Sequence, residues 1–169
     1  MAQAHFEGDV KTLWLVEGPI DDDGPDRRMQ LLVDFAFVDP NGVRWLAPAG
    51  SNIDGASIPR SLWSIVGDPY SGTYRRASVL HDVACDERTQ PSKVVHRMFY
   101  DAMIADGTDT AQAIEFYAAV RLFGPHWDDP APQLARATRQ RRLVKPKLKP
   151  GRRLSIAQVE KALDAALGE

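Results

Sequence analysis

The sequence places two histidines, His81 and His96, in neighbouring segments with helical periodicity, and Asp82 follows His81 directly. Asp54 lies in the turn "NIDGASIP" that precedes these segments. Two imidazoles with one or two carboxylates can bind a divalent ion such as Zn or Mn and leave one position for an activated water. One hypothesis is therefore a metal site made of His81, His96, Asp82 and Asp54.

A second hypothesis needs no metal and makes His81 a general base. Oriented by the carboxylate of Asp54 or Asp82, the imidazole would activate water or the hydroxyl of Ser57. Ser57 lies in a glycine-containing bend where backbone N–H groups can converge on an oxyanion. The G-x-S-x-G motif of many serine hydrolases is absent, however, and serine is also a common helix cap.

A third interpretation treats the same residues as buried structural groups. The ring of His81 would then bond Asp54 or a backbone carbonyl. Cys85, one turn after His81, is a ligand, a reactive thiol or a small core residue. As the single cysteine it excludes an intrachain disulfide and a multi-cysteine zinc site, and a reducing cytoplasm is expected. Arg121 stands among apolar residues and is expected to pair with Asp54 or Asp82.

The first third of the chain is predicted to form a small antiparallel sheet. Alternating apolar residues predict strands over 10–16 and 28–38, the second with Leu31, Val33, Phe35 and Phe37 on one face. The tetrapeptide "DPNG" predicts a tight turn that returns the chain into a strand over 43–47.

Helical periodicity follows over 74–86, 92–105 and 109–124. Asp109 precedes Gln112 by three residues, as in a capping box, and Gly124 with Pro125 ends the third helix. The short link between the first two helices should bring His81 close to His96. The predicted architecture is α+β, with one domain over 1–127.

The motifs D-G-A-S-I-P from Asp54, H-D at His81 and A-V-R-x-F-G from Ala119 stand in an ordered series. The region of about 34–127 that contains them resembles domain of unknown function 1353, a family of phages, prophages and bacteria. The resemblance implies a small phage-type protein in the cytoplasm of an infected or lysogenic bacterial cell, or in the virion. Members of that family tend to have an aromatic residue at the position of Cys85 and an aspartate at that of His96.

The segment from 128 to 153 differs in composition from the rest of the chain. Nine of the 21 Lys and Arg residues fall between Arg136 and Arg153, where no acidic residue occurs. Repeated prolines predict an extended basic arm that binds an acidic polymer or other virion proteins. Nucleic acid is a weaker candidate, because the whole chain has a net charge of −2.

A last amphipathic helix is predicted over 154–169, begun by Ser155 with Gln158 as its capping box. Its apolar residues, at positions 156, 159, 162 and 163, should pack on the body or on another molecule because so short a helix is unstable alone. No run of about 18 apolar residues occurs, so no membrane span is expected.

Two functions therefore stay open. The first is a phage-type hydrolase-like domain, metal-assisted or not, that acts at the histidine and aspartate residues. The second is a non-catalytic virion component that binds neighbouring subunits through the basic arm and the last helix.

Overall fold

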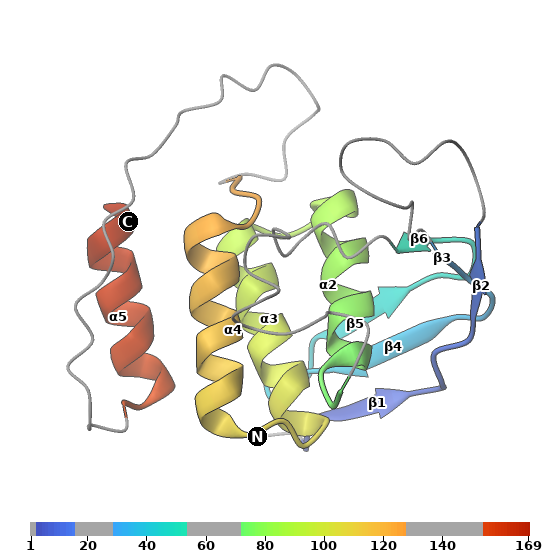
Figure 1. Ribbon diagram of the computed structural model, residues 1–169, viewed down its shortest axis with the longest axis horizontal. Coiled ribbons are helices and arrows are strands. Elements are labelled where there is room, and N and C mark those ends of the chain that lie inside the picture. The colour runs from blue at the N-terminus through green and yellow to red at the C-terminus, as the bar shows by residue number, and fades with distance from the viewer. Residues whose placement is uncertain (1–2, 16–28, 54–71, 128–153) are drawn as a thin grey trace.

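The computed structural model describes residues 3–15, 29–53, 72–127 and 154–169 (Figure 1). The described strands are β1 (His5–Glu7), β2 (Thr12–Trp14), β3 (Met29–Leu31), β4 (Phe35–Val38), β5 (Arg44–Ala47) and β6 (Asn52–Ile53). The described helices are α2 (Arg75–Glu87), α3 (Ser92–Ala105), α4 (Thr110–Phe123) and α5 (Ile156–Leu167). Strands followed by helices make the α+β architecture that the sequence predicted.

The strands form two antiparallel sheets, in the orders β1-β4-β5 and β2-β3-β6. The hairpin between β4 and β5 is held by the side chain of Asp39, which accepts hydrogen bonds from the N–H groups of Asn41 and Val43 at 2.8 and 2.9 Å. Gly42 follows with φ +83°, a conformation that glycine adopts without strain. The predicted tight turn is confirmed.

The single strand predicted over 28–38 is wrong, because the chain leaves one sheet and enters the other between Leu31 and Phe35. The N–H of Leu31 donates to Ser51 at 2.9 Å, and the carboxylate of Asp34 accepts from the N–H of Ala49 at 2.8 Å. Val33 is exposed in this crossing and does not share the buried face of Leu31 and Phe35. Two short strands with separate partners replace one long strand.

The helices form layers beside the β1-β4-β5 sheet (Figure 1). Helix α2 packs on β5, α3 lies beside α2, α4 lies beside α3, and α5 packs on α4. Phenylalanines from the sheet and from two helices are fully buried between these layers, at positions 35, 37, 99 and 116. Burial of each such side chain contributes about 1.5–3 kcal/mol, so this core determines how the helices sit.

Helix α5 packs on its own chain through Val159 and Leu163, which are buried. The predicted capping box is present, and the side chain of Gln158 accepts from the N–H of Ser155 at 3.0 Å. Ala162, predicted on the apolar face, is exposed instead. The prediction that α5 needs a packing surface is met within the molecule.

Several predicted features lie outside the described residues, namely Asp54, Ser57 and the basic arm from Arg136 to Arg153. They therefore stay predictions. None of the described helices combines the length and the apolar character that crossing a bilayer requires.

Candidate metal centre

His81 on α2 and His96 on α3 meet where the two helices pack side by side. Helix α2 ends at Arg88, whose φ of 51° is left-handed and whose N–H donates to Ala84, and Pro91 then starts α3. The short connection aligns the two histidines, and the distance from His81 Nε2 to His96 Nδ1 is 2.8 Å. The predicted approach of the two imidazoles is confirmed.

The hydrogen-bond partners assign the protons of this pair. His96 Nε2 lies 3.1 Å from the carbonyl oxygen of Pro125, which can only accept, so Nε2 carries the proton. His96 Nδ1 is then an acceptor, and His81 Nε2–H donates to it. His81 Nδ1 consequently keeps its lone pair. The network is a directed relay from His81 through His96 to Pro125.

Both imidazoles are enclosed, with 1% of His81 and none of His96 exposed. Burial, and then the neighbouring charge of His96, lowers the pKa of His81 well below its ordinary value. Burial also lowers the pKa of His96 to about 3, against the opposing effect of its hydrogen bond to Pro125, with further lowering by His126 and Arg121. Both rings are neutral at pH 7, the form that binds metal ions and accepts protons.

Cys85 completes a group of three donors. Its Sγ lies 3.7 Å from His81 Nε2 and 3.9 Å from His81 Nδ1, and one ligand atom from each of His81, Cys85 and His96 lies within 4.8 Å of the others. Cys85 is 4% exposed, so the whole group is buried. A buried His-Cys-His group of this kind could hold a metal ion.

The distances can be compared with tetrahedral zinc. Bond lengths of about 2.05 Å to nitrogen and 2.3 Å to sulfur separate a nitrogen and a sulfur ligand by about 3.6 Å, and two nitrogens by about 3.3 Å. The Sγ to Nε2 distance of 3.7 Å fits this spacing. The nitrogen pair at 2.8 Å is closer, at hydrogen-bond distance. The two nitrogens would have to separate by about 0.5 Å to bind one ion in this geometry.

The predicted carboxylate ligands are not among these three donors. Asp82 is buried on the same turn of α2 as His81, and Asp54 lies outside the described residues. Both stay predicted ligands. Cys85, which the sequence left open between ligand and core residue, is the third donor of the described group.

Two residues that cover the three donors at the end of α4, His126 and Trp127, were not predicted from the sequence. Trp127 Nε1–H donates to the carbonyl of Gln90 at 2.7 Å, and the rings of Trp127 and His126 stand edge-on to His96. His126 also contacts the end of α4, where its Nε2 lies 2.7 Å from the carbonyl oxygen of Arg121. The sequence feature that indicates them is the pair of ring-bearing residues directly after the "GP" that ends α4.

Gly124 is required for this closure. A Cβ atom at position 124 would lie 2.4 Å from the backbone oxygen of Val120, far inside van der Waals contact. Only glycine lets the chain leave α4 here and bring the carbonyl of Pro125 to His96.

Arg121 pairs with two carboxylates that were not predicted for it. Its guanidinium, 1% exposed, donates to Asp164 at 3.0 Å and to Glu169 at 2.7 Å. The expectation that Arg121 forms an ion pair is confirmed, with Asp164 and Glu169 as the described partners. Pairing with Asp54, which lies outside the described residues, stays a prediction.

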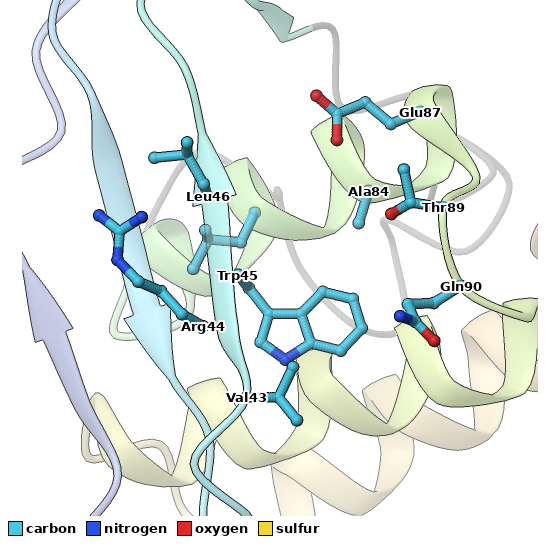
Figure 2. Close-up of a pocket in the computed structure, with 9 residues that line it drawn as sticks. Val43, Arg44, Trp45, Leu46, Ala84, Glu87, Thr89 and Gln90 are labelled. Carbon is cyan, nitrogen blue, oxygen red and sulfur yellow. The ribbon is translucent and has the colours of Figure 1, made fainter.

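A cavity of about 210 Å³ lies between β5 and α2 and is lined by none of the His81, Cys85 and His96 side chains (Figure 2). Trp45 lines it from the strand, and Ala84 and Glu87 line it from the helix. The indole of Trp45 donates to Asp39 at 3.3 Å.

The chain is similar to two uncharacterized proteins of Sinorhizobium fredii. It is 43% identical to y4jT over 110 residues, which are 65% of this chain and 33% of y4jT. It is 42% identical to y4iH over 110 residues, which are 65% of this chain and 46% of y4iH. The matched part thus spans a third to somewhat under half of these relatives. No solved structure matches the chain.

The model of one protein family matches residues 29–120, which are 92 of the 169 residues and reach from β3 into α4, with all three donors inside. The chain therefore belongs to the family described as protein of unknown function DUF1353.

Proposed function

We propose that this chain is a zinc-binding, hydrolase-like domain whose metal centre consists of His81, Cys85 and His96. One observation carries the proposal: three metal-binding side chains from two adjacent helices converge within 4.8 Å in the core. A bound ion would be a partner that all three side chains share.

The donor set favours zinc over manganese. A thiolate with two imidazoles suits zinc, whereas manganese prefers carboxylate and carbonyl oxygens. The hydrogen bond from His96 Nε2 to Pro125 supports the assignment, because metal-binding histidines usually donate their other N–H to a carbonyl or carboxylate. Zinc binding would require the proton on His81 Nε2 to move to Nδ1 and the thiol of Cys85 to lose its proton to solvent.

The number of protein ligands is the reason to propose hydrolysis as the reaction. Three protein ligands leave zinc one position for water, and zinc lowers the pKa of a bound water toward 7. Asp54 and Asp82 are the carboxylates proposed to accept a proton from that water, and Ser57 is the alternative nucleophile. The phage association implied by the resemblance favours a polymer of the bacterial cell surface as the substrate class.

Metal analysis of the full chain, purified under reducing conditions, tests the metal centre. We expect one zinc ion per chain in the wild type and in the His5→Ala control, whose histidine is exposed. Cys85→Ala and His96→Ala should each lose the ion. A wild type that binds no zinc, even after refolding with zinc, would contradict the proposal.

Cobalt substitution tests whether water reaches the ion. A thiolate-to-cobalt charge-transfer band should appear in the wild type and be missing in Cys85→Ala. Addition of azide should change the cobalt spectrum if one coordination position is open. An unchanged spectrum would contradict the hydrolase-like role while leaving the zinc centre intact.

The enclosure of the three donors favours a second candidate function. His81, Cys85 and His96 are 1%, 4% and 0% exposed. A cluster enclosed in this way would hold α2 against α3 in a non-catalytic phage or virion component. Such a protein would bind its neighbours through the basic arm. Closed zinc coordination, with loss of the fold in Cys85→Ala, is the result expected for this role.

A further inference from the structure

At the junction of α5 with the helices beneath it, cations of α3 and α4 face carboxylates of α5 and Glu169, and Asp101 of α3 also pairs with Arg97. The ion pairs between described residues across this junction are Lys93 to Asp164 at 2.6 Å, Arg97 to Glu160 at 2.9 Å, Arg121 to Asp164 at 3.0 Å and Arg121 to Glu169 at 2.7 Å. We call Lys93, Arg97 and Arg121 the cationic surface.

The apolar contacts of α5 follow the same pattern as its charges. Val159 and Leu163, one turn apart, are 3% and 2% exposed. Each is followed directly by the acid that pairs with the cationic surface, Glu160 and Asp164. The part of α5 that contacts the cationic surface is therefore an apolar residue followed by an acidic residue, and this pair occurs twice, at 159–160 and at 163–164.

Arg121 indicates that an acidic helix belongs on this surface. Its guanidinium is almost fully buried and also donates a hydrogen bond to the hydroxyl of Tyr117 at 3.3 Å. A buried guanidinium needs carboxylate partners, and both of them come from α5 or the residue that ends the chain.

The attachment of α5 is suited to exchange. Its 12 residues are too few for a helix that is stable alone. The side chains of Lys93 and Arg97 are 46% and 37% exposed, so water and salt weaken their ion pairs. Helix α5 also lies outside the matched family region, 29–120, to which most of the cationic surface belongs.

We propose that the cationic surface is a docking site for an acidic amphipathic helix of a partner protein, and that α5 occupies it within the chain until the partner displaces it. The partner helix carries two apolar–acidic pairs one turn apart, in the pattern of 159–160 and 163–164. This interaction shares no residue with the proposed zinc centre and does not depend on it.

The probe is a fluorescent peptide with the sequence of 154–169, and the targets are full-length chains. Leu163→Asp removes an apolar contact of α5 and should free the surface, while Ala162→Asp changes the exposed neighbour and serves as the matched control. We expect the peptide to bind Leu163→Asp at least 10-fold more tightly than it binds the wild type or the control, in which α5 competes from a high effective concentration.

Further variants test whether the charges of α5 and of the cationic surface account for the binding of the peptide. A full chain with Glu160→Lys and Asp164→Lys frees the surface without a change in the core, and it should bind the peptide as Leu163→Asp does. Adding Arg121→Met to Leu163→Asp, or raising NaCl from about 50 to 500 mM, should weaken binding about 10-fold. Circular dichroism shows that each variant is folded.

Two results would overturn the proposal. One is a folded Leu163→Asp chain and a folded Glu160→Lys, Asp164→Lys chain that bind the peptide no better than the wild type. The other is a wild-type dimer in light scattering that Leu163→Asp abolishes, because the occupant would then be α5 of a second copy.

Discussion

Acid should destabilise the metal-free protein through its buried histidines. The pKa of His96 is about 3 in the fold and near 6.5 in the unfolded chain. Between these values the unfolded chain binds a proton that the folded chain does not, so stability is full above pH 6.5 and falls as the pH is lowered toward 3. Burial lowers the pKa of His81 as well, which acts in the same direction.

The magnitude follows from the two pKa values of His96. From pH 7 to pH 5, the unfolded chain gains about 1.9 kcal/mol from protonation of this one residue relative to the fold. Solvent does not reduce this contribution to the free energy of unfolding, because the ring of His96 has no exposed surface. The wild type should therefore lose more than this amount once His81 is included.

Urea unfolding at pH 7 and pH 5, with a chelator present, measures the effect. The chelator is needed because protons also compete with a metal for the same nitrogens. His96→Gln should lose about 1.9 kcal/mol less than the wild type between the two pH values, whatever its stability at pH 7. His5→Gln, with an exposed histidine, should lose as much as the wild type.

Equal losses in the wild type and in His96→Gln would refute the reasoning. His96 would then be protonated in the fold as readily as in the unfolded chain. The enclosed relay from His81 to Pro125 would not exist in solution.

Three further outcomes follow from single side chains. Asp109→Ala should cost about 1 kcal/mol in urea unfolding, because Asp109 accepts from the first backbone amides of α4, while the exposed Glu115→Ala should cost under about 0.5 kcal/mol. Asp39→Ala should cost about 2–4 kcal/mol because two amides and the indole of Trp45 lose their acceptor, and Asp39→Asn should recover more than half of that loss; equal losses would contradict this account. Burial raises the pKa of Tyr117 to about 12, so a rapid alkaline titration by absorbance should show a late ionisation that Tyr117→Phe removes.

The helices could be predicted from the sequence because their signals are local. The predicted bounds of α3, 92–105, match the structure, and the cap of α4 at Asp109 depends on residues within one turn. The approach of His81 to His96 was predictable for the same reason, since a short link joins two periodic segments.

The remaining features depend on residues far apart in the sequence. Alternation of apolar residues runs past Leu31. The break there comes from two hydrogen bonds, one donated by the N–H of Leu31 to Ser51 and one donated by the N–H of Ala49 to Asp34. The partners of Arg121 lie more than 40 residues later, beyond the basic arm. No local pattern indicates contacts of this kind.

The third donor posed a different problem. Cys85 has the spacing of a core residue and of a ligand alike, since positions i and i+4 share a helix face in both cases. Only the position of α3 shows which atoms surround the thiol.

The pairing of the first four strands limits how far this domain can be shortened from its N-terminus. Strand β2 pairs with β3, and β1, which precedes β2, pairs with β4, which follows β3. The matched family region begins at Met29, so a chain shortened to that region would lack the outer strand of both sheets. Strands β3 and β4 would then become open edges, which bind other chains and promote aggregation. The smallest unit expected to keep both of these edges covered therefore begins before His5, ahead of the boundary that sequence similarity marks.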